Sequence, residues 1–100
     1  MSDMMIKTES VYTKFTHNDG SHSSYMQKLG EMYSAGKTNG YSETHHRMNC
    51  DCSLDQLMSS TVTRFWADQE SAQEWKDFLI SLNEQFDQGL KSTDILPVDN

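Results

Sequence analysis

The sequence predicts an α+β fold, in which two helices cover one face of an antiparallel sheet. A strand, a tight turn and a long amphipathic helix can be read in order over residues 61–86, and a similar strand and helix precede them over residues 6–35. The later strand also carries large aromatic side chains on both of its sides. With 100 residues, the chain is long enough for a single domain, residues 1–100, with one modest hydrophobic core.

The helix that follows residue 68 has the clearest periodicity in the chain. Apolar residues recur at steps of three and four, which places them on one helical face: Ala72, Trp75, Phe78, Leu79, Leu82 and Phe86. We expect the Asp68 carboxylate to accept backbone N–H groups of the first turn, although Ser71 and Glu74 offer a second capping box one turn later. Gly89 is the expected end, because glycine tolerates the left-handed conformation found there.

The strand over residues 61–67 has two informative faces. Alternation places Val62, Arg64 and Trp66 on one side and Thr61, Thr63, Phe65 and Ala67 on the other. Helices shield only one face of the predicted sheet, so the second aromatic side needs another cover. In a chain this short, the expected cover is a second copy of the protein, which predicts a homodimer.

The other elements complete the expected order. Residues 1–5 read as a frayed start, 6–15 as the first strand, and 17–21 as a turn. A helix is expected over about 23–35, with Gly36 at its end and one apolar stripe: Tyr25, Met26, Leu29, Met32 and Tyr33. Residues 37–40 read as a loop, 41–50 as a polar second strand, and 51–60 as a connection with a short helical turn. Residues 90–100 contain Pro97, which cannot donate to a sheet ladder, so we expect an edge strand or an arm on the dimer partner. This βαββα order, with a possible last β, is that of the ferredoxin-like fold.

The charge and cysteine content exclude several classes of partner. The formal net charge is -7, with 15 acidic and 8 basic residues, which argues against binding nucleic acid through phosphates. The acidic groups are scattered, so a solubilising surface is favoured over an acidic decoy that mimics nucleic acid. No apolar run is long enough for a membrane span or a signal-peptide core. Two cysteines that lie two positions apart do not form a disulfide framework, so a reducing cytoplasm is expected.

The segment over residues 61–82, TVTRFWADQESAQEWKDFLISL, resembles the dimeric α/β-barrel superfamily, whose best-known branch is the antibiotic-biosynthesis monooxygenase-like domains. The resemblance implies a homodimer whose two sheets pack face to face, with a pocket in each subunit between sheet and helices. Some members are cofactor-free oxygenases that act on aromatic substrates, and others bind haem or degrade small metabolites. Asn, Trp and His or Tyr side chains line the pocket of the oxygenase members, and Trp66 is the position that aligns here.

The candidate ligand-binding residues follow from this pocket and from the chemistry of the neighbouring strands: Trp66, His45, His46, Asn49, Arg64 and Tyr12. Aromatic rings can hold a flat ligand by stacking. For Trp66 the alternative is a place in the core or in the dimer interface. Arg64 either pairs with Glu43 or another carboxylate, or clamps a substrate.

The same region offers a second chemistry, that of a soft metal site. On an extended strand His46, Met48, Cys50 and Cys52 point the same way, and their groups suit Cu(I) or zinc. Their spacing matches no standard zinc signature. We therefore expect no metal and no cofactor. A nucleophilic Cys50 would need His45 or His46 as its base within hydrogen-bond reach, which the geometry of the neighbouring strands would decide.

Two functions remain open at this point. The first is a small homodimeric domain that binds a small aromatic molecule, with or without a monooxygenase-like reaction on it. The alternative is a non-enzymatic protein-interaction module with an acidic surface. A partly apolar cavity near Trp66 favours the first, and an exposed apolar patch over a filled core favours the second.

Overall fold

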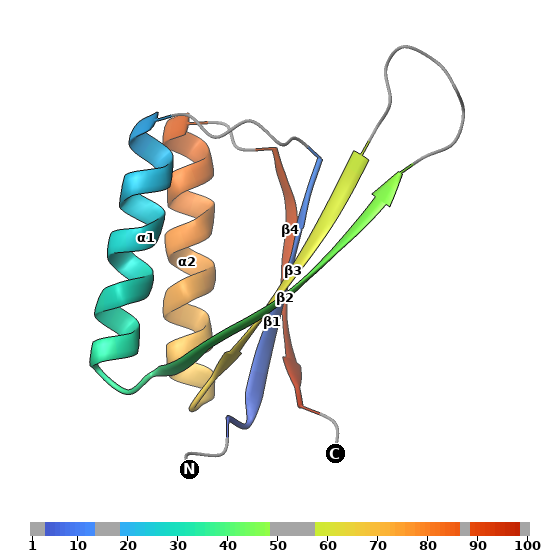
Figure 1. Cartoon of the computed structure of the whole chain (residues 1–100). Coiled ribbons are helices and arrows are strands. Elements are labelled where there is room, and N and C mark those ends of the chain that lie inside the picture. Colours follow the sequence, from blue (N-terminus) through green and yellow to red (C-terminus); the bar gives the residue numbers. More distant parts are fainter. Residues whose placement is uncertain (1–3, 14–18, 49–57, 87–88, 99–100) are drawn as a thin grey trace.

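A four-stranded antiparallel sheet with both helices on one face forms the molecule (Figure 1). The computed structural model describes residues 4–13, 19–48, 58–86 and 89–98, without the side chains of 19–22, 46–48 and 58–59. The elements in chain order are β1 (Ile6–Tyr12), α1 (Asp19–Ser34), β2 (Thr38–Met48), β3 (Met58–Trp66), α2 (Gln69–Phe86) and β4 (Leu90–Pro97). The strand order is β2-β3-β1-β4, which confirms the predicted ferredoxin-like α+β fold.

Three elements begin earlier than the sequence pattern indicated. Strand β3 begins at Met58, so residues 58–60 belong to the strand and not to the predicted connection with its helical turn. Helix α1 begins at Asp19, so Asp19 and Gly20 form its first turn rather than the predicted turn before it. Strand β2 begins at Thr38, within the predicted loop. Its ladder with β3 shifts register between Thr38 and Ser42, and Gly40 takes a φ of 79° in this irregularity. The Thr38 hydroxyl donates a 2.7 Å hydrogen bond to the Phe65 carbonyl, which anchors the strand across the shift.

The hydrophobic core lies between the sheet and the helices. Its buried residues are Met32, Trp66, Ala72, Trp75 and Leu79. Trp66 and Trp75 are 0% and 1% exposed, and their rings lie 5.3 Å apart between centroids. The expected inner stripe of α1 is wrong in part, because Met26 and Tyr33 are exposed. Tyr33 lies against Gly40, where an added Cβ would meet the ring at 3.1 Å.

The two faces of β3 differ as predicted. Trp66 lies in the core, so the alternate residues Arg64 and Val62 also face the helices. Phe65 lies on the other face, where its ring contacts Tyr41 of β2 with centroids 5.8 Å apart. Large aromatic side chains therefore occur on both faces of the sheet.

Asp68 and Gly89 mark the two ends of the α2 segment. The Asp68 carboxylate accepts a 2.8 Å hydrogen bond from the Ser71 backbone N–H, so the cap is Asp68 and not the alternative box at Ser71. This hydrogen bonding from Ser71 lowers the pKa of the Asp68 carboxyl from its usual value. Helix α2 ends at Phe86, three residues before Gly89, the expected end, whose φ is 74°.

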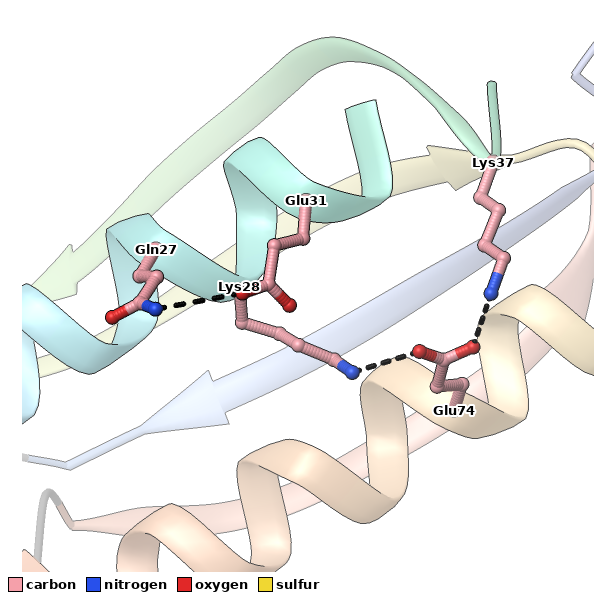
Figure 2. A network of polar contacts seen from close by, with 5 residues as sticks. All are labelled: Gln27, Lys28, Glu31, Lys37 and Glu74. Atoms are coloured by element: carbon pink, nitrogen blue, oxygen red, sulfur yellow. Dashed lines mark hydrogen bonds and ion pairs between the residues drawn. The ribbon is translucent and has the colours of Figure 1, made fainter. Parts of the chain in front are cut away.

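Glu74 does not cap α2 and instead joins three parts of the fold. Figure 2 shows its carboxylate between Lys28 of α1 and Lys37 of the loop before β2, each with Nζ 2.7 Å from a carboxylate oxygen. Hydrogen bonds from these two ammonium groups lower the pKa of the Glu74 carboxyl from its ordinary value of 4.5. The network ties α1 to α2 at the surface of the helix layer.

The ends of the described chain lie along the sheet. Strand β4 pairs with β1 at one edge, as the edge-strand alternative for this segment expected. Met5, which the sequence placed in a frayed start, donates its backbone N–H to the Trp66 carbonyl and accepts from the Val98 N–H, each at 3.1 Å. No helix in residues 4–13, 19–48, 58–86 and 89–98 is long and apolar enough to span a membrane.

Candidate functional site

Polar side chains of three elements face the layer between the sheet and α1: Tyr12 of β1, Tyr25 of α1 and Arg64 of β3, of which Tyr25 and Arg64 are in contact. The Arg64 Nε donates a 2.9 Å hydrogen bond to the Tyr25 hydroxyl. The guanidinium carbon lies 5.4 Å from the centroid of the Tyr25 ring and 5.9 Å from that of Trp75. Arg64 is thus held by one hydrogen bond and two aromatic faces on the core side of the sheet.

Aromatic rings form the wall beside this polar trio. The Tyr25 ring meets Trp75 edge-on, with centroids 5.1 Å apart and planes at 73°. Trp75 contacts Phe78 at 5.5 Å and Trp66 at 5.3 Å in turn. Edge and offset ring contacts of this kind fix side-chain orientation. The wall therefore presents Arg64 with a rigid aromatic surface.

The helix-facing side of the sheet is unusually polar for a buried surface. Its buried hydroxyl residues are Thr8, Ser10, Ser60 and Thr93, none more than 6% exposed. The Trp66 Nε1 donates to the Thr8 Oγ1 at 2.9 Å, and the Thr93 hydroxyl donates to the Ser10 Oγ at 3.3 Å. Hydroxyl groups in an apolar layer need such partners, because unpaired burial is costly. The layer between the sheet and the helices thus combines hydroxyl groups of the sheet with aromatic rings.

The third polar residue of the group is Tyr12. It is half-buried, and this burial, together with nearby Tyr25, raises the pKa of its phenol, while Arg64 lowers it by a smaller amount. The phenol therefore stays protonated at physiological pH. No hydrogen bond between described residues uses its hydroxyl, and no fully buried side-chain polar atom in the described residues lacks a partner. The hydroxyl accordingly keeps contact with solvent.

Arg64 does not pair with Glu43, so that expectation is wrong. Glu43 lies opposite Thr63 in the ladder between β2 and β3, while Arg64 lies opposite Ser42. Successive residues of a strand point to opposite faces, so Glu43 projects away from the helices and Arg64 towards them. The ion pairs formed within the described residues join lysines to Glu9 and Glu74, and none includes Arg64.

The other predicted ligand-binding residues are not gathered at this point. Trp66 lies next to the site but is fully buried. His45 is exposed and lies opposite Thr61, on the sheet face away from Trp66. His46 lies opposite Ser60 in the ladder, and its side chain is not among those described. Asn49 falls outside the described residues.

Tyr25 is the site residue that sequence reasoning missed. It was assigned to the apolar stripe of α1, and its spacing gave no sign that its hydroxyl would meet Arg64, 39 residues later. Cys50 and Cys52, which the sequence offered as ligands of a soft metal site, also fall outside the described residues. Within the described residues, no group of three His, Cys, Asp or Glu side chains is placed to hold a metal ion.

The open face of the sheet is a second surface of interest. Beside the rings of Tyr41 and Phe65 it carries Val11 of β1 and Leu96 of β4, both partly buried. Lys7 and Glu9 form an ion pair of 3.5 Å on the same face. Figure 1 shows no helix over this side of the sheet.

No protein-family model matches the chain, and no curated protein sequence matches it. The chain is similar to a dimeric ferredoxin-like protein from an uncultured marine organism, with 11% identity and a TM-score of 0.48 over 99% of this chain and 91% of that one. It is also similar to a hypothetical protein of Arabidopsis thaliana, with 8% identity and a TM-score of 0.43 over 96% of this chain and 87% of that one. The ferredoxin-like assignment rests on the strand order and antiparallel pairing of the chain itself.

Proposed function

We propose that the protein binds a small, flat aromatic molecule between its sheet and helix α1. The observation that carries the proposal is the half-buried trio of Tyr12, Tyr25 and Arg64 beside the Trp75 ring. A layer whose only task is to fill a core is cheapest when it is apolar. Here an arginine and a tyrosine hydroxyl project into it, next to rings on which a flat ligand can stack.

The resemblance to monooxygenase-like domains extends this proposal to a reaction on the bound molecule. Binding is the part that the described residues support, through the polar trio and the aromatic wall. A monooxygenase-like activity towards a small aromatic substrate is the finer form of the proposal. We also keep the cytoplasmic location expected from the sequence as part of this proposal.

We also propose that the chain works as a homodimer through the open face of the sheet. Phe65 and Tyr41 form a ring pair there, and Leu96 lies on the same face. Large apolar side chains that no helix covers favour association. The acidic protein-interaction module remains the second candidate, because the same face would suit a different protein.

Two indole N–H groups make the binding test simple, since the chain has only two tryptophans. We expect titration with indole or benzamide to shift the Trp75 indole N–H resonance saturably in NMR spectra. Tyr25→Phe should weaken this binding, because it releases Arg64 from its hydrogen bond. Tyr33→Phe is the matched control, because Tyr33 lies on the same helix and is exposed. A spectrum that no aromatic probe changes would refute the proposal.

A further inference from the structure

We infer that the ligand carries a carboxylate, which the terminal amino groups of Arg64 and the Tyr12 hydroxyl bind together. This inference rests on the proposed function and names the class of molecule that its site takes. The relevant chemistry is an aromatic or similarly flat carboxylic acid, with its ring against the Tyr25 and Trp75 wall.

The first argument is the uncompensated charge of Arg64. The chain has 15 acidic residues, yet no carboxylate of the described residues lies in ion-pairing distance of this guanidinium. By contrast, Lys28 and Lys37 at the edge of the helix layer share Glu74. A half-buried cation is stabilised by a counter-charge, so an anionic ligand would supply what the fold does not.

The second argument is the direction of the free donors. The hydrogen bond from Nε to Tyr25 and the contacts with two rings fix the plane of the Arg64 guanidinium. The two terminal amino groups of Arg64 form no hydrogen bond with the other described residues. Their planar arrangement matches the two oxygens of a carboxylate. A guanidinium held in advance loses little further freedom on binding.

The third argument is the adjacent phenol. Tyr12 and Arg64 lie on the same face of neighbouring strands, with Tyr12 opposite Ser60 and Arg64 opposite Thr8. The arginine charge acts on the Tyr12 hydroxyl over this separation. As a protonated hydroxyl in contact with solvent, it can donate to an anion but cannot itself neutralise Arg64. In the proposed complex, the Tyr12 hydroxyl donates to the carboxylate that Arg64 binds, and both donors come from the same face of neighbouring strands.

A single carboxylate suits this site better than a phosphate. The site offers one arginine, and Lys28, the lysine of α1, is already bound to Glu74. In a chain of net charge -7, a dianion would meet a repulsive overall field. A monoanion is balanced by the one guanidinium.

The test compares benzoate with benzamide, which has nearly the same shape but no charge. We expect the wild-type protein to bind benzoate about tenfold or more tightly than benzamide, as hydrogen bonds to charged groups are the stronger ones. Arg64→Gln should abolish this preference. Tyr12→Phe removes one hydroxyl and should weaken benzoate binding about fivefold, the scale of a single hydrogen bond.

Two control variants match these changes at exposed sites. Lys91→Gln removes a positive charge from β4, and Tyr33→Phe removes an exposed phenol hydroxyl; both should leave the benzoate preference unchanged. Circular dichroism and the melting temperature of each variant show whether it is folded. If Arg64→Gln does not fold, Tyr12→Phe and the benzoate-to-benzamide ratio still decide the matter.

The outcomes separate the two proposals. If indole and benzamide shift the Trp75 resonance but benzoate binds no more tightly than benzamide, the carboxylate inference is overturned and the aromatic site stands. If the preference survives both Arg64→Gln and Tyr12→Phe, the charge is recognised elsewhere and the inference is also overturned. If no probe binds, the proposed function fails, and the inference with it.

Discussion

The indole N–H of Trp66 donates a 2.9 Å hydrogen bond to the hydroxyl of Thr8, which joins β3 to β1 inside the core. The two residues are 0% and 1% exposed, so water cannot replace either partner. Thr8 lies opposite Arg64 and Ile6 lies opposite Trp66, so the bond is diagonal across the ladder. This hydrogen bond fixes the orientation of the Trp66 indole, and the aromatic wall beside Arg64 depends on that orientation.

Removal of the Thr8 hydroxyl should destabilise the protein without changing the volume of the core much. We expect Thr8→Val to lower the free energy of unfolding by about 1–3 kcal/mol, because the Trp66 N–H would be buried without a partner. Urea denaturation measures the change. Thr44→Val, at an exposed position of β2, is the control and should stay within about 0.5 kcal/mol of the wild type.

A double-mutant cycle with Trp66→Phe isolates the bond from the packing of the ring. In the Trp66→Phe background the Thr8 hydroxyl has no indole to serve, so Thr8→Val should cost clearly less than in the wild type. Equal costs in the two backgrounds would mean that the bond contributes nothing to stability.

Truncation of Trp75 tests the core that the sequence pattern identified. Its ring contacts Trp66, Tyr25 and Phe78. We expect Trp75→Ala to lower the free energy of unfolding by about 3–5 kcal/mol, because it leaves a cavity among these rings. Denaturant unfolding or calorimetry gives the value, and a loss below about 1 kcal/mol would show that the ring is not part of a closely packed core.

The fold could be predicted because its determinants are local. The apolar steps from Ala72 to Leu82 define α2, and alternation along β3 separates Trp66 from Phe65. The irregularity at Gly40 was not predictable, since it depends on how Thr38 bonds across to Phe65. The exposed side of α1 was also missed, because its apolar residues span more than one helical face.

The site was predictable only in part, because its residues are brought together by strand pairing and helix packing. Tyr12 and Arg64 have the same parity on strands that become neighbours, yet their shared face and their separation along it depend on the register of β1 and β3. The opposite placement of His45 likewise follows from the pairing of β2 with β3. The contribution of Tyr25 depends on how α1 crosses the sheet, which no strand or helix period encodes.

Acid should weaken the Glu74 network in a defined direction. Because Lys28 and Lys37 lower the pKa of this carboxyl in the folded state, its stabilising effect is complete above the unfolded value of about 4.5 and is lost as pH falls through the lower folded value. We expect Glu74→Gln to be less stable than the wild type at neutral pH by at most about 1 kcal/mol, since the group is partly exposed.

The difference between Glu74→Gln and the wild type should shrink as the pH is lowered below about 4, and also in high salt. Glu84→Gln is the matched control, because Glu84 lies exposed on the same helix and forms no ion pair within the described residues. A stability difference for Glu74→Gln that is independent of pH would contradict the assigned role.

A charge placed on the open sheet face should break the proposed homodimer. Phe65 lies opposite Lys7 on this face and pairs with the Tyr41 ring, so Phe65→Glu would bury a carboxylate in any face-to-face assembly. We expect the wild type to sediment as a dimer at micromolar concentration and Phe65→Glu as a monomer. Ile80→Glu is the control, since Ile80 is an exposed apolar residue of α2 in the other layer, and it should remain dimeric. A wild type that stays monomeric, with Phe65 open to solvent, would leave the face free for a different protein and favour the interaction-module alternative.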